Sequence, residues 1–452
     1  MIELILAYVA SLGPFVVAAI LVGLVIPFAS PWIWNHSDRW LFFLIFGLGL
    51  TTFGSGTVGS EGSLVKQLPW GSLFAFCALK LFFDKQVTFR WSLQGLAPPL
   101  LLLIGFALVS LSWSPVPEVS MKRLAQIIGI LLIGLLVTKQ MLEGRGLLTQ
   151  MIWPAAFYLC IGLVFALGIP SAGFDDDHAL RAFSSHKNTW GQFSLIATLT
   201  FSLAFVTQRQ YRWVYFGLMC VAVTSLFASR SSTSILAFVL LAGILFSWLA
   251  LNRWGVLGKI FVILAICIVA MVTHVYIVIT ANSPIEYLTE QVFSATGKSS
   301  TFSGRVYLWK LLFSEIARHP WFGIGYGGFW TGIEGASGMV IRQLNWGPPT
   351  QSHSGYIDVA NELGFIGLAL LALLLLSQLR NLIRLYRSGE NEFSLFHSAI
   401  LFCTIVINYA ETSFLRTTHL WWIVFCISII EVNVRIANNS FKLPRDFLED
   451  EK

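Results

Sequence analysis

The chain has 452 residues, of which 56% are hydrophobic and only 12% are charged, and its formal net charge is +6. Soluble domains carry about 25% charged residues, so this low share, with a mean hydropathy of +0.74, excludes a soluble globular protein and a disordered chain. The basic residues are scattered between apolar runs, which excludes a nucleic-acid-binding protein. Lipid forces backbone groups to pair within helices or closed barrels, and runs of about 20 apolar residues favour helices. We therefore expect an all-α, polytopic membrane protein.

Apolar runs recur along the chain and predict about 12–13 transmembrane helices. They lie at roughly 4–29, 40–55, 68–83, 94–112, 122–138, 150–168, 188–207, 213–229, 232–250, 257–280, 355–377, 394–410 and 418–434. Thirteen spans would leave the N-terminus outside and twelve would put it inside, and the sequence leaves both open. Tryptophans such as Trp70, Trp190 and the pair Trp421-Trp422 stand near span ends, where an indole ring can contact water on one side.

Lys and Arg residues in the short loops predict the orientation of the chain. If the spans alternate, the basic loops 84–91, 139–146, 208–213, 251–259 and 377–394 share one side, which is then cytoplasmic. The other side carries 113–121, 169–188, Arg230, a long loop and 411–418. Five regions follow: N-terminal transmembrane helices (1–93), a transmembrane core (94–280), a periplasmic loop (281–354), C-terminal transmembrane helices (355–434) and a cytoplasmic tail (435–452).

The loop 281–354 is the one long segment between spans, and loops of this length usually have a function. Ser303 is expected to cap an amphipathic helix that ends near Arg318, before His319-Pro320. Its apolar residues at helical spacing are Val306, Trp309, Leu312, Phe313 and Ile316. The glycine-rich run at 323–328 lacks the spacing and context of a phosphate loop, and we interpret it as a flexible turn over the bundle.

Basic residues on the expected external side break the positive-inside pattern. They are Arg181, His186, Lys187, Arg230, Arg305, His353 and Arg416. Together they indicate an anionic substrate such as a phosphate or pyrophosphate, although any one of them could be a snorkelling interface residue. Arg230 stands between two spans with almost no loop, where a cation is costly unless it is paired with an anion.

Three polar strings in this region follow one another in a fixed order. They are Ser229–Ser234 (SRSSTS), Ser303–Trp309 (SGRVYLW) with His319–Gly325, and Ser352–Asp358 (SHSGYID) running into Asn361–Gly364. Two further strings are Trp113–Glu118 (WSPVPE) and Ser185–Asn188 (SHKN). The ordered set resembles the O-antigen ligase/polymerase superfamily over about 94–420. The HKN string is most similar to its exopolysaccharide-production polymerase (ExoQ-like) branch.

The resemblance implies a membrane glycosyltransferase of the GT-C type in the bacterial inner membrane, with its active site facing the periplasm. Such an enzyme takes a glycan from an undecaprenyl-diphosphate carrier and passes it to an acceptor hydroxyl. A polymerase uses the next lipid-linked repeat unit as acceptor and makes surface or exopolysaccharide, whereas an O-antigen ligase uses lipid A–core. The resemblance implies no cofactor, nucleotide sugar or metal; its partners would be membrane lipid and a chain-length regulator.

The resemblance also assigns roles to single residues. Arg230 and Arg305 would bind the diphosphate, and His353 would lie beside the reacting centre, either as general base or as a diphosphate ligand. The family often has Asn after this His, whereas here the next residue is Ser354.

Several acidic residues are further candidates. Asp358 and Glu362 are four residues apart on one helix and share a face, so they could orient His353 or an arginine, or pair within the bundle. Glu411 and His419 flank the last external loop and could also contribute. The run Asp175–Asp177 suggests a metal site, but no His or Glu at suitable spacing accompanies it, and we interpret it as a solvated loop.

A second class of function is a flippase or transporter for lipid-linked glycans. Transporters tend to have internally symmetric halves and charges or broken helices at the membrane midplane. This sequence has no detectable two-fold repeat and few charges within its spans, while its polar residues gather at one mouth. We therefore predict a polysaccharide polymerase, with the ligase as the alternative within the same chemistry.

Overall fold

The structure, a computed structural model, describes residues 36–52, 64–84, 95–142, 147–253, 299–344 and 348–440. The helices of this part of the chain are α4 (Ser37–Thr52), α5 (Leu64–Phe83), α7 (Pro98–Val109), η2 (Ser110–Ser112), α8 (Pro117–Leu142), α9 (Leu147–Gly168), α10 (Pro170–Gly173), α11 (Lys187–Thr207), η3 (Arg209–Tyr211), α12 (Arg212–Ala228), α13 (Ser232–Arg253), α16 (Ser299–Ile316), α17 (Gly338–Ile341), α18 (Gly355–Arg387), α19 (Asn391–Ala410) and α20 (Leu420–Ser440). The described residues form no strand apart from one isolated bridge between Phe174 and Leu180.

Seven of these helices are long and apolar enough to cross a membrane, and four shorter apolar helices accompany them. The prediction of an all-α polytopic membrane protein is thus confirmed. Eleven of the thirteen predicted runs coincide with these helices, whereas the runs at 4–29 and 257–280 lie outside the described residues. The total of 12–13 spans therefore stays a prediction.

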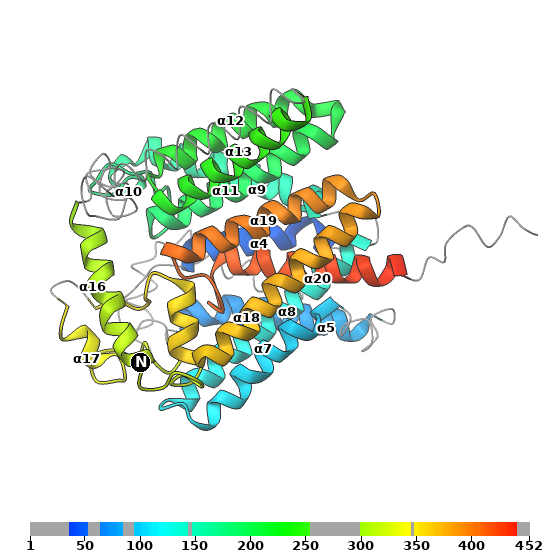
Figure 1. Cartoon of the computed structure of the whole chain (residues 1–452). Coiled ribbons are helices and arrows are strands. Elements are labelled where there is room, and N and C mark those ends of the chain that lie inside the picture. Colours follow the sequence, from blue (N-terminus) through cyan, green and yellow to red (C-terminus); the bar gives the residue numbers. More distant parts are fainter. Residues whose placement is uncertain are drawn as a thin grey trace, which may run out of the picture.

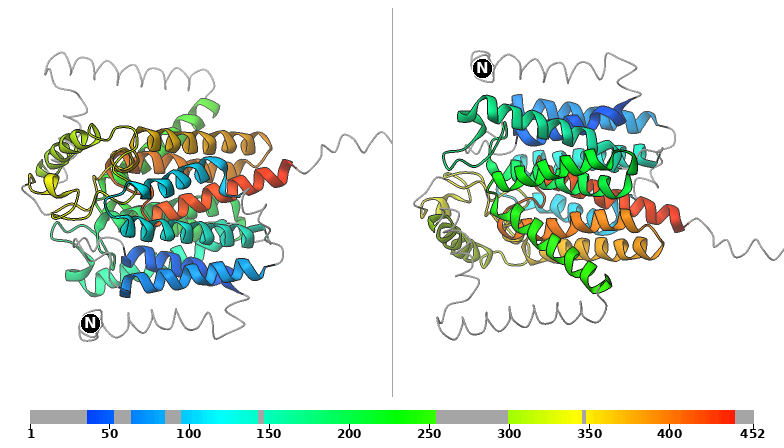
Figure 2. Two further views of the ribbon diagram at one scale, coloured as in Figure 1. Left: turned by 90° about the horizontal axis from the view of Figure 1, so that it is seen from below. Right: turned by 90° about the horizontal axis from the view of Figure 1, so that it is seen from above.

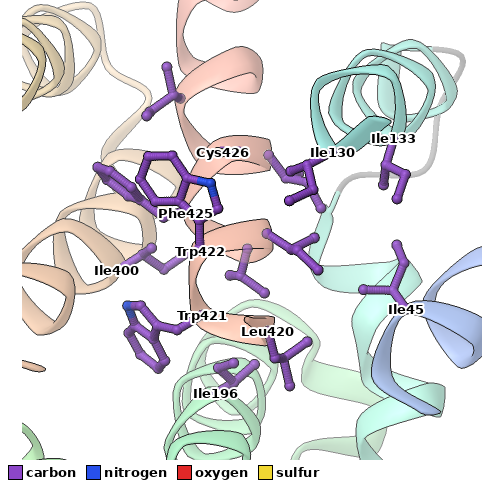
Figure 3. Packing of buried hydrophobic residues seen from close by; sticks show 14 of the residues in the cluster. Ile45, Ile130, Ile133, Ile196, Ile400, Leu420, Trp421, Trp422, Phe425 and Cys426 are labelled. Carbon is purple, nitrogen blue, oxygen red and sulfur yellow. The ribbon is translucent and has the colours of Figure 1, made fainter. Parts of the chain in front are cut away.

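Helix α20 is the central element of the bundle. Nearly every residue from Leu420 to Val434 is buried, and a helix that is apolar all round belongs in the interior. Its side chains meet Ile45 of α4, Ile130 and Ile133 of α8, Ile196 of α11 and Ile400 of α19 (Figure 3). Helices α9, α11, α12 and α13 form one flank, and α5, α7, α8 and α18 form the other (Figure 1).

The expectation that the tryptophans near span ends are partly wet is wrong for four of them. Trp70, Trp190, Trp421 and Trp422 are at most 1% exposed. Trp421 donates its indole N–H to Thr404 Oγ1 at 2.8 Å, and Trp190 donates its indole N–H to Ser225 Oγ at 2.9 Å, so these two N–H groups are hydrogen-bonded although they are buried. They are core residues that set how the helices pack.

Close helix approaches depend on residues that have no side chain. Lipid tails are as apolar as leucine, so helices in a membrane associate mainly through close packing, often at small residues. The Cα of Gly162 on α9 lies against the ring of Trp190 on α11, and Gly134 on α8 lies against Ile430 on α20. A Cβ at either position would overlap the opposing side chain. Gly105 on α7, by contrast, has open space around it.

The spans alternate between two ends of the bundle, as the loop pattern predicted. At one end, Lys139 of α8 pairs with Asp84 after α5, and Arg435 of α20 pairs with Glu390 before α19. We call this the basic end. The opposite end carries α10, α16 and α17 (Figures 1 and 2). We call it the site end, formed by residues 110–118, 170–190, 229–231, 305–344, 348–362 and 411–419.

Helix α16 caps the site end and is the predicted helix of the long loop, with two corrections. It begins at Ser299, so Ser303 lies inside the helix and is not its N-cap. Leu308, Leu312 and Ile316 form its buried face, packed with Phe329 and Ile357, among others. Phe313 is 57% exposed and so does not belong to that face.

Helix α18 is broken at Gly364, where φ is 66° and ψ is −166°. This backbone conformation is open almost only to glycine. The break leaves helical hydrogen-bond groups without their usual partners, and residues 320–325 supply replacements. Ile324 N and Gly325 N donate to the carbonyls of Asn361 and Glu362, and Phe365 N donates to Pro320 O at 2.7 Å. The long loop is therefore bound into the core.

Candidate functional site

Glu411 lies at the centre of the site end, where α19 has just ended. Its side chain is 6% exposed, and it joins three elements that are distant in sequence. Asn188 of α11 donates to Glu411 Oε1 at 2.6 Å, and Arg305 Nη2 of α16 donates to the same oxygen at 3.2 Å. His353 Nδ1 is 3.8 Å from the other oxygen, Oε2. Arg305 also donates to the carbonyl of Ala410 at 2.8 Å.

The surroundings of Glu411 keep it ionised. Burial alone would raise the pKa of this carboxyl, because desolvation penalises charge. The adjoining His353 ring, the Arg305 guanidinium and the more distant His186 outweigh that effect and lower the pKa of Glu411 to about 2. Burial lowers the pKa of the neighbouring His419 to about 3, so this imidazole is neutral at physiological pH.

His353 has a left-handed backbone, with φ of 57°. The turn is held by its two neighbours: Ser352 Oγ donates to Ser354 O at 2.7 Å, and Ser354 N donates to Ser352 Oγ at 3.0 Å. The His353 side chain is 26% exposed, whereas Ser354 is buried and its hydroxyl faces Asn408 O at 3.4 Å. Ser354, which stands where the family often has Asn, therefore supports the turn with its backbone and faces α19 with its hydroxyl.

Asp358 on the first turn of α18 organises a second polar group. Its carboxylate accepts hydrogen bonds from Trp330 Nε1, Thr412 Oγ1 and Arg416 Nη2 at 2.9, 2.7 and 3.1 Å, and from the amide of Ser352. Of the roles open to Asp358 in the sequence, orienting an arginine fits the structure. Arg416 is thereby fixed beside the 350–353 segment, where it also donates to Thr350 O.

Glu362 lies one turn further along α18 and binds the glycine-rich segment. Gly327 N donates to Glu362 Oε2 at 2.9 Å, and Arg123 of α8 lies 3.9 Å from Oε1. Tyr326 N donates to Ser110 Oγ at 2.9 Å. The amides from 324 to 328 are thus used within the protein, which is incompatible with a phosphate loop and agrees with a turn over the bundle.

The three residues of the HKN string have three different partners. His186 caps α11 by accepting from Asn188 N at 3.1 Å. The ammonium of Lys187 bridges the carboxylates of Asp175 and Asp177 at 2.6 and 2.8 Å. Burial would raise the pKa of Asp175, but the Lys187 contact and backbone N–H donors lower it. The third residue, Asn188, reaches Glu411.

The acidic run at 175–177 is therefore a partner for Lys187 and not only a solvated loop. Within the described residues, no group of three or more His, Cys, Asp or Glu side chains has a metal-binding arrangement. Two of the predicted substrate ligands have protein partners nearby: Arg230 Nη1 donates to Asp177 O at 2.6 Å, and Arg181 Nε donates to Ala172 O at 3.0 Å.

Arg230 shares a backbone feature with His353, because its φ is also positive, at 48°. Its side chain is exposed. Serines again hold the turn: Ser231 N donates to Ser229 Oγ, and Ser231 Oγ bonds Ser234 Oγ at 3.0 Å. Strained backbone conformations of residues other than glycine are found most often at functional sites.

Comparison with known proteins shows two similarities. A family model described as O-antigen ligase matches residues 216–372. The exopolysaccharide production protein ExoQ of Rhizobium meliloti (strain 1021) is 24% identical over 306 residues, which cover 66% of this chain and 68% of that protein. Residues 216–372 are therefore similar to the O-antigen ligase family. The resemblance inferred from the ordered strings is confirmed.

The matched segment, residues 216–372, contains Arg230, Arg305, His353, Asp358 and Glu362. Other predicted site residues lie outside it, namely Arg181, His186, Lys187, Glu411 and Arg416. The structure brings Arg305, His353 and Glu411 into one group and Arg416 into the adjoining Asp358 group. Arg181, Lys187 and Arg230 have partners in the 172–177 segment.

The HKN string was noted in the sequence, but Asn188 was not predicted as a site residue. Its position could have indicated a role, because Asn188 stands at the start of an apolar span, where burial of an unpaired amide costs free energy. Trp330 and Thr412 of the Asp358 group were also not predicted. Neither stands in a pattern that marks a site, because their partner lies 28 and 54 residues away in sequence.

Proposed function

We propose that this protein is a membrane glycosyltransferase that polymerises undecaprenyl-diphosphate-linked oligosaccharide repeat units into surface or exopolysaccharide. The reaction takes place at the site end, which faces the periplasm of a bacterial inner membrane. One observation carries the proposal: Arg305, His353 and Glu411 meet at one end of an apolar helix bundle. At the end of a transmembrane bundle a lipid carrier in the bilayer and a glycan in water can both be reached.

The chemistry requires a cation for the leaving group and a base for the acceptor. The acceptor oxygen forms a bond to the anomeric carbon, while the bond from that carbon to the diphosphate oxygen breaks and its electron pair leaves with the diphosphate. Guanidinium groups stabilise that charge well because they are planar, permanently charged and donate in pairs. Arg305 uses two N–H groups within the protein, and a guanidinium has five.

His353 takes the proton of the acceptor hydroxyl in this scheme. It is the partly exposed histidine of the Glu411 group, and the nitrogen of a neutral imidazole that carries no hydrogen can accept a proton. Arg230 adds a second cation for the diphosphate when its exposed side chain leaves the Asp177 carbonyl. The proposed chemistry is independent of a metal ion, and a chain-length regulator protein is the proposed partner.

The ligase is the second candidate, because the family model that matches carries that description. The relative named for exopolysaccharide production favours the polymerase. The two enzymes break the same donor bond and differ in the acceptor, so one assay with two acceptors distinguishes them.

The test uses purified full-length protein in detergent with a diphosphate-linked oligosaccharide donor. Polymerase activity gives products that grow in steps of one repeat unit, while ligase activity requires added lipid A–core. Arg305→Ala and His353→Ala should each reduce donor consumption at least about 100-fold. The matched control is Arg318→Ala, which removes an exposed arginine two residues past the end of α16. Among the described residues, its side chain contacts Glu315 and Met339.

Two outcomes would contradict the proposal. Donor consumption that persists in both variants would remove Arg305 and His353 from the reaction. Movement of the donor across vesicles with no chemical change would indicate a flippase instead.

A further inference from the structure

The two carboxylate oxygens of Glu411 have different partners. Oε1 accepts from Asn188 at 2.6 Å and from Arg305 at 3.2 Å. Oε2 faces His353 Nδ1 at 3.8 Å. Asn188 and Arg305 come from α11 and α16, so two separate helices fix the plane of the carboxylate. The oxygen that remains points at one edge of the imidazole.

We propose that Glu411 is the positioning residue for His353. It orients the imidazole with Nδ1–H towards Oε2, which leaves Nε2 to accept the proton of the acceptor hydroxyl, and its charge stabilises the imidazolium that results. This inference deepens the proposed glycosyl transfer and rests on it. A carboxylate that fixes the tautomer of a catalytic histidine is a general device, and its loss reduces the rate without destroying the site.

The two other roles open to Glu411 fit less well. A general base needs a pKa near the working pH, and the surroundings of Glu411 lower its pKa to about 2. A direct ligand of the diphosphate would carry the wrong charge, because a carboxylate repels phosphate oxygens. Glu411 can act only through the cations around it.

Other charged or titratable groups also surround His353 and Glu411. Arg305 of α16 forms an ion pair with Glu411, and His186, which precedes α11, interacts electrostatically with Glu411. His419 follows on the same loop as Glu411 and interacts with it, and Arg416 acts on His419. The other carboxylate of this region, Asp358, is bound to Arg416, Thr412 and the amide of Ser352. Replacing Glu411 by an amide therefore removes the carboxylate that lies 3.8 Å from His353 and leaves Arg305 in place.

The first experiment measures the rate of donor consumption against pH for wild type, Glu411→Gln and Asn188→Ala. We expect Glu411→Gln to reduce the plateau rate about 100-fold, with the KM for the donor within about twofold because Glu411 does not touch the donor. Its acid limb should move to lower pH, since protonation of His353 becomes less favourable. Asn188→Ala should lower the rate about tenfold, because the carboxylate loses one of its two fixed donors.

The second experiment follows the protonation of His353 by a measurement that does not depend on enzyme activity. Diethyl pyrocarbonate modifies neutral imidazole, and mass spectrometry of the peptide containing His353 follows its modification against pH. Glu411→Gln should move the midpoint of this profile down by about 1 pH unit. His353 is 26% exposed and so open to the reagent.

Glu431→Gln is the matched control for both experiments. Glu431 is a buried carboxylate that also lies beside a histidine and an arginine, His397 at 3.4 Å and Arg435 at 3.2 Å, but it belongs to α20 and not to the site end. Its replacement should leave the acid limb and the His353 midpoint unchanged, provided that gel filtration shows an intact protein.

The outcomes separate this inference from the proposed reaction. An unshifted midpoint and an unchanged plateau in Glu411→Gln, in a protein that His353→Ala inactivates, would refute the role of Glu411 and leave glycosyl transfer standing. A shifted midpoint in a wild type that consumes no donor would support the Glu411–His353 coupling and overturn the reaction.

Discussion

His353 and Arg230 have backbone conformations that cost folding energy. A non-glycine residue in the left-handed region is about 1–3 kcal/mol less stable than in its usual conformation, so the neighbouring serines must hold each turn closed. In both cases the serines are buried and bond to each other or to nearby backbone. The serine-rich strings around these residues therefore each support the backbone of one proposed site residue.

Replacement of Ser352 tests directly whether the serines hold the turn at His353. Ser352→Ala removes both hydrogen bonds that close the turn at His353, and we expect transfer activity to fall about tenfold because the imidazole is less well placed. The thermal unfolding midpoint should fall by only a few degrees, since two neutral hydrogen bonds contribute about 1–3 kcal/mol.

Ser314→Ala is the control for Ser352→Ala, because Ser314 is an exposed serine of α16 with one hydrogen bond to its own helix. It should leave both activity and unfolding unchanged. Full activity in Ser352→Ala would mean that the turn at His353 holds without its serine.

Among the helices, glycine contacts decide how closely neighbours approach. Replacing Gly162 by Ala puts a methyl group into the ring of Trp190, a residue with no exposed surface. Overpacking of this kind costs about 1–3 kcal/mol, so the unfolding midpoint of Gly162→Ala in detergent should fall by several degrees.

Gly105→Ala is the comparison for Gly162→Ala. It makes the same change in a helix where nothing lies within 4 Å of the new methyl group, and alanine is the better helix former. We expect an equal or slightly higher unfolding midpoint. Equal losses in the two variants would show that helix flexibility, and not packing, explains these glycines.

The positions of the helices could be read from the sequence, but their neighbours could not. Span length depends on a local run of apolar residues, and for this reason α8, α11 and α19 appear where hydropathy predicts them. Hydropathy cannot tell a lipid-facing apolar residue from a buried one, so it assigned Trp421 and Trp422 to the wet edge of a span that is the centre of the bundle. The start of α16 was misjudged because Ser303 has cap chemistry yet lies within a helix.

For the whole molecule, the two ends of the bundle are the feature that could be predicted, because loop charge alone separates them. The partners at the site end could not. Asn188 and Glu411 are 223 residues apart, and only the packing of α11 against α19 and α20 brings them together. A single sequence carries no information on such a pair beyond the cost of burying each side chain alone.

The side of the membrane on which each end of the bundle lies can be tested by cysteine labelling. In a cysteine-free background, a cysteine at exposed Arg318 should react with a membrane-impermeant maleimide added to intact spheroplasts. A cysteine at exposed Arg387, at the end of α18, should react only after the membrane is opened. The reverse pattern would put the site end in the cytoplasm and the proposed substrate on the wrong side.

The reciprocal fit between the break in α18 and the 320–325 segment has a consequence for making chimeras. Gly364 would place a Cβ against the backbone of Trp321, and Gly323 would place one against the backbone of Glu362, so neither partner tolerates a foreign counterpart of different shape. An exchange of the long loop between relatives, intended to transfer acceptor preference, must carry 361–366 with it. The unit that must be exchanged is thus discontinuous in sequence, consisting of the long loop together with six residues of α18.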